Sequence, residues 1–298
     1  MSAPRTGRPG EAALIAASPV LFVLCWASGF PAIKFGLEFI EPFTLLTVRS
    51  ALNVAVVLAV IPFFGIKWPR SWRAAGHIAV SGFLFQFAYL GAIYTALGGG
   101  VSQGVVALVA GMQPILTAAL VGPLLSERIS PRQWAGFVLG FGGVAFVMSE
   151  RIAIAEATAL GFIASACTPI LITAASLYQK RFCADMDLRS GMVIQHAAAG
   201  VASAVVAFSI ETREIDWGFE LGFVLVWLVL ILSVAAVNLY YMMLRRGQAA
   251  RVSSLFYLTP PTAVVLGYLT YGEVFGWYGI AGFAIAVVGV ALATRGEP

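Results

Sequence analysis

The sequence predicts an all-α polytopic membrane protein with ten transmembrane helices, arranged as two inverted repeats of five. Three observations predict this fold. First, 60% of the 298 residues are hydrophobic and 11% are charged, whereas a soluble domain carries about 25% charged residues. Second, the apolar residues fall in blocks of about 20, the length that crosses the hydrocarbon of a bilayer. Third, the second half of the chain repeats the first at a fixed offset.

The predicted spans follow one another with short connections, so the chain has no room for an additional domain. The glycines 98–100 form the turn between the third and fourth spans, and Glu127 and Glu273 close the fourth and the ninth. In chain order, the ten spans are 12–33, 43–64, 75–96, 101–124, 132–149, 157–179, 190–210, 219–244, 250–271 and 277–294.

Lysine and arginine fall mostly on one side of these spans. Fourteen of the 18 lie on the side that holds both termini. The opposite side has Lys34, Arg151 and Arg213, and Arg49 lies within a span. Because cytoplasmic loops carry the excess of Lys and Arg, we expect both termini in the cytoplasm. Two termini on one side require an even number of spans, which agrees with ten.

The internal repeat has an offset of 146 residues. Pro114 recurs as Pro260, and Ala135–Ala145 recurs as Ala281–Ala291. Each half has five spans, an odd number, so the second half enters the membrane from the opposite side. Secondary transporters are often built from such inverted repeats, with the substrate held between them. The two predicted repeat domains are 1–150 and 151–298.

The sequence gives no indication of a cofactor, a metal site or nucleic-acid binding. Cys25, Cys167 and Cys183 are odd in number and lack the spacing of metal ligands. The basic residues are scattered over short loops, and topology explains the net charge of +4. The chain has no Walker motif, so ATP is not the expected energy source. The first apolar run is too long for the core of a cleavable signal peptide.

One segment near the first span carries a family resemblance. Leu24–Lys34 reads LCWASGFPAIK, and Pro42 and Arg49 follow it. This pattern resembles the drug/metabolite transporter superfamily in its EamA-type branch, where a Trp-small-Ser-small-aromatic stretch precedes a Lys, and a Pro and an Arg follow. The ends of the fourth and ninth spans resemble the repeated signature of that branch. The overall pattern is similar to the YddG-type amino-acid exporters of bacterial inner membranes.

This resemblance implies a ten-helix basket in the inner (plasma) membrane of a bacterium. Eight helices surround a central cavity, and the fifth and tenth pack at the periphery. Those two spans carry small residues at a spacing that lets helix backbones approach closely. We expect them to pack within the chain, as in a monomer, and a homodimer is the alternative. The expected partners are the lipid bilayer and a small-molecule substrate.

The candidate substrate-binding residues are polar and aromatic side chains near mid-depth. Polar groups inside lipid are expensive and usually face a cavity or a partner. Each one alternatively only bonds or packs between helices. Together they would form a cavity without formal charge, suited to a small zwitterionic or amphipathic solute. These residues are Trp26, Ser28, Gln86, Tyr89, Gln113, Asn238, Tyr241 and Tyr257.

Prolines inside the spans are candidate hinges. A proline removes a backbone hydrogen bond and kinks its helix, and the freed carbonyl can bind solute or serve a hinge. The glycine turn between the third and fourth spans would let that hairpin rock, or it is a plain turn. The candidate hinge residues are Pro114, Pro169, Pro260 and Gly99.

A few ionisable residues lie inside the predicted spans. We expect Arg49 to extend outward toward Glu38 or Glu41, and a substrate carboxylate is the alternative partner. His77 and His196 lie near the ends of their spans and are expected to be ordinary hydrogen-bonded histidines.

These features predict a transporter, not an enzyme. We expect export of neutral or aromatic amino acids and related small metabolites by alternating access. The alternative is efflux of amphipathic drugs such as quaternary ammonium compounds, which an aromatic lining permits. Proton-coupled drug efflux normally needs an intramembrane carboxylate, and no Asp or Glu falls in the middle of a span. An intramembrane enzyme would need clustered acids or histidines to hold a metal, and here the interfacial acids are scattered.

Overall fold

The computed structural model is helical through nearly all the residues that it describes. One isolated antiparallel bridge joins Ile40 to Ile215. Four predicted site residues, Pro114, Asn238, Tyr241 and Tyr257, lie outside the described part of the chain. The described residues are 9–64, 66–113, 116, 130–153, 157–236, 239, 258–274 and 276–294.

The first half begins with a span that is broken at Ser28. Pro31 has no N–H to donate to the carbonyl of Ala27, and the first helix gives way to the second at this point. Farther on, Ser71 accepts a hydrogen bond from the backbone N–H of Ala74 and begins the fourth helix. The elements are α1 (Pro9–Ala27), α2 (Gly29–Gly36), α3 (Pro42–Phe64), α4 (Trp72–Gly82), the π-helix η1 (Phe83–Tyr89), α5 (Leu90–Gly98), α6 (Gln103–Ala110) and α8 (Pro131–Ala153).

Side-chain caps begin two helices of the second half. Thr158 accepts from the N–H of Gly161 at the start of α9, and Asp187 accepts from the first N–H groups of α10. The elements are α9 (Ala159–Phe182), α10 (Leu188–Ile210), α11 (Phe219–Val226), the π-helix η2 (Trp227–Ala236), α14 (Thr259–Tyr271) and α15 (Trp277–Thr294).

Six helical segments in the described part of the chain are long and apolar enough to cross a membrane. Two shorter apolar helices, Trp134–Val147 and Trp277–Gly289, lie in the fifth and tenth predicted spans. The fourth and ninth predicted spans are described in part, as α6 and α14. The six segments are Ala17–Gly36, Pro42–Val60, Trp72–Gly98, Ala159–Phe182, Leu188–Ile210 and Phe219–Ala236.

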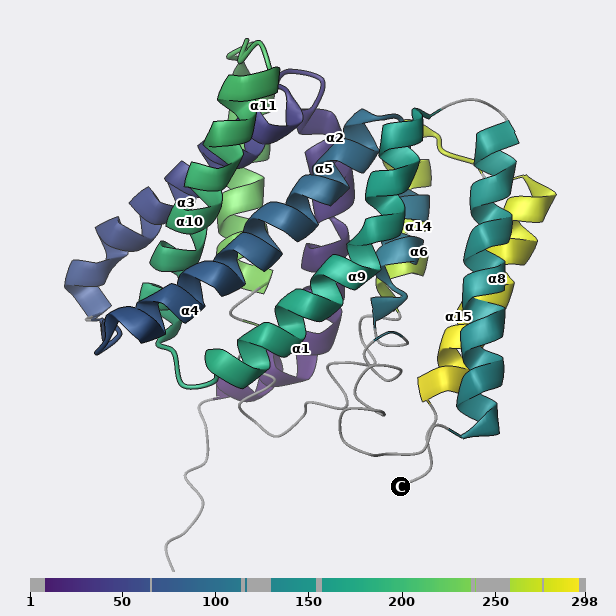
Figure 1. Ribbon diagram of the computed structural model, residues 1–298, viewed down its shortest axis with the longest axis horizontal. Helices are drawn as coiled ribbons and strands as arrows, with labels where there is room; N and C mark the ends of the chain where they lie inside the picture. Colours follow the sequence, from purple (N-terminus) through teal and green to yellow (C-terminus); the bar gives the residue numbers. More distant parts are fainter. Residues whose placement is uncertain are drawn as a thin grey trace, which may run out of the picture.

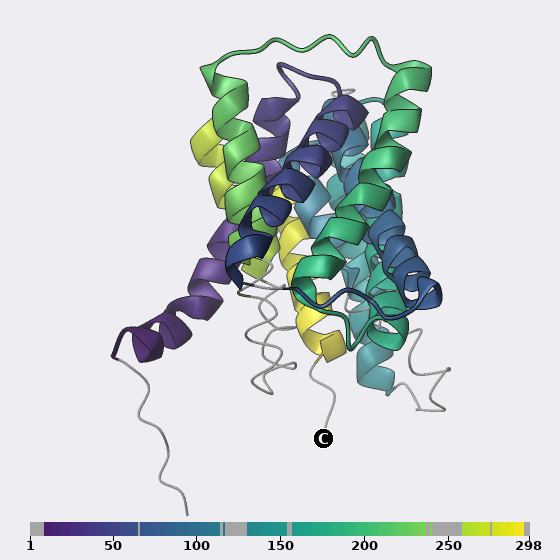
Figure 2. The ribbon, with the colours of Figure 1, turned by 90° about the vertical axis from the view of Figure 1, so that its left-hand side faces the viewer.

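The helices pack in pairs that the sequence repeat relates. Shifting α3 by 146 residues gives 188–210, the bounds of α10, and these two helices pack on each other. In the same way α8 packs on α15, which begins at residue 277, 146 residues after the start of α8. The described parts of the fourth and ninth predicted spans, α6 and α14, also pack on each other. The α8–α15 pair stands at one edge of the bundle (Figure 1). The first residue of α1 and the last of α15 lie at the same, lower end (Figure 2).

Small residues allow α8 and α15 to touch backbone to backbone. A Cβ added to Gly143 would lie 2.4 Å from the backbone nitrogen of Ala286, and one added to Gly289 would lie 2.2 Å from that of Gly140. Real Cβ atoms do not approach other atoms so closely, so these positions accept only glycine. The expected packing of these small residues within the chain is confirmed.

Hydrogen bonds to two glutamates join the connection before α3 to the connection after α10 at the upper end of the bundle. Glu211, which ends α10, accepts hydrogen bonds from the backbone N–H groups of Phe43 and Thr44, at 2.8 and 2.7 Å, and so caps α3. Glu41, which precedes α3, accepts from the backbone N–H of Arg213 at 2.8 Å in return. Both carboxylates are therefore bound to backbone groups at the bundle surface.

Candidate functional site

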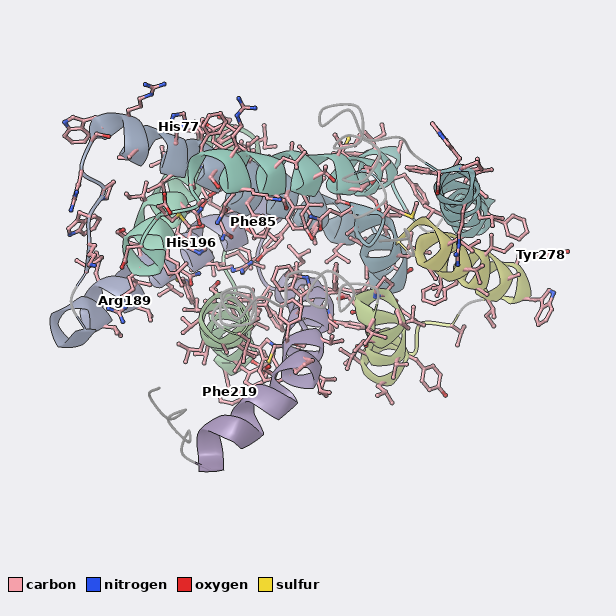
Figure 3. The ribbon with its side chains drawn as sticks, turned by 90° about the horizontal axis from the view of Figure 1, so that it is seen from below. His77, Phe85, Arg189, His196, Phe219 and Tyr278 are labelled. Carbon is pink, nitrogen blue, oxygen red and sulfur yellow. The ribbon has the colours of Figure 1, made fainter. Side chains whose placement is uncertain are left out.

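Two π-helical segments lie at equivalent places in the two halves. Shifting 83–89 (η1) by 146 residues gives 229–235, which falls inside η2. Long π-helices are rare, and π-helical turns occur frequently at functional sites. Their position marks the interior of the bundle: Phe85 of η1 lies among the helices, whereas Tyr278 of α15 lies on the outer surface (Figure 3).

A cavity of about 50 Å³ lies between the two π-helical segments. Its walls come from η1, η2 and both sides of the break in the first span, together with α3 and α5. The lining residues are Trp26, Gly29, Phe30, Ile33, Arg49, Phe85, Gln86, Tyr89, Leu90, Ile93, Leu232 and Ser233.

A second, smaller cavity of about 20 Å³ shares Trp26, Phe30 and Tyr89 with the first. It adds residues where the fourth and ninth predicted spans are irregular. There α6 ends in a turn at Gly111, and α14 begins with prolines in its first turn. Discontinuous helices around a midplane site are common in secondary transporters. The other lining residues are Ala107, Ala110, Gly111, Gln113, Ile172 and Thr259.

Arg49 lies in the wall of the larger cavity and is only 3% exposed. Its Nη1 donates to the hydroxyl of Tyr94 at 3.0 Å, and its Nη2 donates to that of Ser233 at 3.2 Å. Its Nε is buried without a partner among the described residues. The prediction that Arg49 extends outward to Glu38 or Glu41 is therefore wrong, because its side chain turns inward. The prediction of a cavity without formal charge is also wrong.

The other predicted binding residues divide into two groups. Trp26, Gln86, Tyr89 and Gln113 line one or both cavities. Ser28 lines neither: its hydroxyl donates to the carbonyl of Cys25 at 2.8 Å and accepts from the indole of Trp227 at 3.0 Å. Ser28 therefore links the break in the first span to η2. Gln113 also has a structural bond, from its amide nitrogen to Ser176 at 3.0 Å.

The cavity also contains residues that were not predicted as binding residues. Phe85 and Ser233 line the larger cavity, but most of their neighbours in the sequence are apolar and do not indicate which face is inside. Gly29 and Phe30 were noted only as part of the family pattern. A Cβ on Gly29 would lie 2.6 Å from Leu232, so the glycine lets the broken first span approach η2.

Pro169 does not leave a free carbonyl. It lies inside α9, where its missing N–H would have bonded the carbonyl of Ser165. The hydroxyl of Thr168 donates to that carbonyl instead, at 2.7 Å. This carbonyl therefore has a donor within its own helix, and the role of Pro169 as a hinge stays a prediction.

Replacing Thr168 with valine should cost about 1 to 2 kcal/mol of unfolding free energy, because the Ser165 carbonyl then has no donor. The same change in a Pro169→Ala background should cost less, because residue 169 then supplies the N–H. Thermal unfolding of the four proteins in detergent gives this double-mutant cycle. Equal costs in both backgrounds would show that Thr168 does not replace the missing bond.

Pro260 and Gly99 have packing roles in the structure. Pro260 lies in the first turn of α14, where a helix has no N–H bond to lose, and its ring contacts the position of Gly111. Pro260 therefore does not kink the described part of its span. A Cβ on Gly99 would lie 2.6 Å from the Thr158 hydroxyl, and the Gly99 carbonyl accepts from Thr158 at 2.8 Å. Hinge motion at Gly99 stays a prediction.

A charge pair joins the upper ends of three spans. Lys34, in the last turn of α2, lies 2.6 Å from the carboxylate of Glu273, just after α14. The same carboxylate oxygen accepts from the backbone N–H of Gln103, which begins α6, at 3.4 Å. The ammonium of Lys34 also lies over the ring of Tyr271, 4.4 Å from its centroid. Lys34 and Glu273 are 28% and 10% exposed, so the pair is partly shielded from water.

The two histidines have different surroundings. Nδ1 of His77 lies 2.8 Å from the hydroxyl of Tyr178, and its ring stacks on Phe182, so His77 is hydrogen-bonded as expected. His196 is 2% exposed and its Nδ1 has no partner in the described part of the chain. Its ring lies among the helices of the bundle (Figure 3).

Comparison with known proteins agrees with this architecture. The EamA-like transporter family matches twice, over residues 12–149 and 159–295. The chain belongs to the EamA-like transporter family. The two matches cover nearly all of it, and the members of this family are transporters rather than enzymes. The protein is therefore a multi-pass membrane transporter.

Several relatives match along most of their length. A probable terminal-alkyne amino-acid exporter of Streptantibioticus cattleyicolor is 29% identical over 294 residues, covering 93% of this chain and 92% of the relative. The inner membrane transporter YedA of Escherichia coli (strain K12) is 25% identical over 275 residues, covering 92% and 88%. One crystal structure superposes with a TM-score of 0.65 at 21% identity, covering 96% of this chain and 97% of that one, which supports the fold.

Proposed function

We propose that the protein exports amino acids and related small zwitterionic metabolites across the bacterial inner membrane by alternating access. The observation that carries this proposal is the cavity between η1 and η2. It combines aromatic rings with an amide, a hydroxyl and a guanidinium, a mixture that suits a solute with both apolar and charged parts. A relative named as a probable terminal-alkyne amino-acid exporter supports the same substrate class.

We also propose ten spans with both termini in the cytoplasm, divided into repeats at about residue 150. The pairing of α3 with α10 and of α8 with α15 supports an inverted two-fold arrangement. The connections 66–71 and 183–187 lie at the lower end with the helical termini (Figures 1 and 2). Lys67 and Arg70 fall in the first of these connections, and excess positive charge marks the cytoplasmic side.

Alternating access requires that the two ends open in turn. The pair between Lys34 and Glu273 holds the upper ends of the first, fourth and ninth spans together, so it closes the outer end in this state. The irregular points at Gly111 and at the start of α14 lie beside the second cavity. We propose that the third and fourth spans move against the eighth and ninth about these points.

Replacing Gln86 or Gln113 with alanine should lower the transport rate without loss of folded protein. Gln86 lines the larger cavity and Gln113 the smaller one, so each amide is placed to bond a polar solute. A loss of about 1 to 3 kcal/mol of solute binding, or five- to 150-fold, is typical of a lost polar contact. The comparison is Ser209→Ala, an exposed hydroxyl on α10 that bonds its own helix. Unchanged transport in both variants would show that Gln86 and Gln113 do not contact the solute.

The direct test of function is uptake of radiolabelled amino acids into proteoliposomes that contain the purified protein, with and without a pH gradient. Counterflow of neutral and aromatic amino acids is the expected result. The competing function is efflux of quaternary ammonium compounds, which the aromatic lining also permits. Proton flux that depends on such a drug, with no movement of amino acids, would replace the proposed function by drug efflux.

A further inference from the structure

The larger cavity holds a buried cation without a neutralising carboxylate among the described residues. A guanidinium stays protonated at any physiological pH, so it cannot escape burial by losing its charge. Burying such a charge is costly unless an anion pairs with it. The one ion pair in the described part of the chain joins Lys34 to Glu273. The partners of Arg49 are the neutral hydroxyls of Tyr94 and Ser233.

The nearby acidic residues at the upper end are used elsewhere. Glu41 accepts hydrogen bonds from Thr212 and from the backbone of Arg213. Glu211 caps α3 at Phe43 and Thr44, six and five residues before Arg49 in the same helix. Both bind backbone groups at the bundle surface, and Arg49 faces the interior.

The guanidinium is held in a defined orientation. It has five N–H donors, and the described residues accept from two of them. Tyr94 is completely buried, and the hydroxyl of Ser233 donates to the carbonyl of Leu228 at 3.1 Å, so its oxygen is oriented to accept from Arg49. A guanidinium fixed in this way suits two parallel bonds to a carboxylate.

The rest of the cavity complements the other parts of an amino acid. Trp26, Phe30, Phe85 and Tyr89 supply apolar faces for a side chain and can cover an ammonium group through cation–π contact. Gln86 supplies an amide oxygen that can accept from an ammonium. An organic cation without a carboxylate would instead meet the like charge of Arg49 in a site shielded from water, which is unfavourable.

We infer that Arg49 anchors the carboxylate of the transported solute, so that the site selects zwitterions and organic anions over organic cations. This inference rests on the proposed function and sharpens it. It also separates amino-acid export from quaternary ammonium efflux by the charge that the site accepts.

Three probes with the same ring and different charged groups test the inference. L-phenylalanine has a carboxylate and an ammonium, 3-phenylpropionate has the carboxylate alone, and 2-phenylethylamine has the ammonium alone. Their binding to the purified full-length protein is measured by calorimetry. We expect wild type to bind the two carboxylates more tightly than the amine. Arg49→Gln should weaken binding of both carboxylates by about 30-fold or more and should leave the amine unchanged or improved.

Two further variants separate binding from folding. Ser233→Ala keeps Arg49 but removes one of the two hydroxyls that accept its hydrogen bonds. This variant should bind carboxylates about three- to tenfold more weakly and should rank the three probes in the same order of affinity as wild type. Arg49→Gln should unfold at the wild-type temperature or above, because it removes an unpaired buried charge, whereas a purely structural arginine would lower that temperature. If Arg49→Gln does not fold, the relative affinities of wild type for the three probes still test the inference.

The inference is overturned if wild type binds 2-phenylethylamine as tightly as 3-phenylpropionate, or if folded Arg49→Gln retains carboxylate binding. Proteoliposome uptake distinguishes this failure from failure of the proposed function. If wild type and Arg49→Gln show equal amino-acid counterflow, the role of Arg49 is refuted but the proposed export is not. If the protein binds carboxylates but shows no counterflow, the proposed export is refuted but the binding site is not.

Discussion

Joining position 34 to position 273 with a short crosslinker should reduce transport to the rate of empty liposomes. The ammonium of Lys34 and the carboxylate of Glu273 are 2.6 Å apart, and the same carboxylate accepts from the start of α6. A covalent link would keep the outer end closed, so solute would not leave on that side. The measurement is amino-acid counterflow by Lys34→Cys/Glu273→Cys in a background lacking Cys25, Cys167 and Cys183, before and after a bis-thiosulfonate reagent.

Two controls accompany this experiment. Reduction of the crosslink should restore the rate that the double variant shows before treatment. The second control is a crosslink at the same face in the variant Glu41→Cys/Thr212→Cys. It replaces an exposed 2.9 Å hydrogen bond between two loops. Because these loops lie outside the hairpins that we expect to move, this crosslink should leave transport unchanged. Full transport through the 34–273 crosslink would mean that this charge pair does not close the pathway.

Replacing Gly82 with valine should cost about 3 kcal/mol or more of unfolding free energy. Gly82 ends α4 directly before η1, and a Cβ there would lie 2.3 Å from Cα and 2.5 Å from the carbonyl oxygen of Gln195 on α10. Backbone atoms cannot move aside as a flexible side chain does, so the two helices must separate. This would also displace η1 and the cavity wall that it forms.

The matched control lies on the same helix. A Cβ on Gly76 would meet no atom within 4 Å, so Gly76→Ala should be neutral or stabilising by up to about 1 kcal/mol from helix propensity. Thermal unfolding and the folded fraction on size-exclusion chromatography measure both variants. If Gly82→Val unfolds at the wild-type temperature, the close approach of α4 to α10 does not exist in the protein.

The helical membrane fold and the repeat were predictable because they depend on hydrophobicity and on residue spacing. The π-helical segments were not predictable, because η1 and η2 are mostly apolar, as an α-helical span would be. A change from i−4 to i−5 bonding is visible only in the backbone geometry, even though the repeat places the two segments at equivalent positions.

The candidate site was predictable only in part. A glutamine at mid-depth is costly in lipid and is therefore expected to face a cavity or a partner, and large aromatic residues there are candidates for the same lining. Trp26, Gln86, Tyr89 and Gln113 do line cavities. The direction of Arg49 was not predictable, because its partners Tyr94 and Ser233 lie 45 and 184 residues away in the sequence. Ser28 was misassigned because its partner, the indole of Trp227, is 199 residues away in the sequence.

We expect the solute to bind between η1 and η2, and photolabelling shows where it binds. The purified protein in lipid nanodiscs is irradiated with p-azido-L-phenylalanine, and the adducts are located by mass spectrometry. We predict adducts on peptides that contain Trp26, Phe85 or Tyr89, which excess L-phenylalanine suppresses. Adducts confined to lipid-facing residues such as Phe208 on α10, which is 73% exposed, and insensitive to competition would contradict the account.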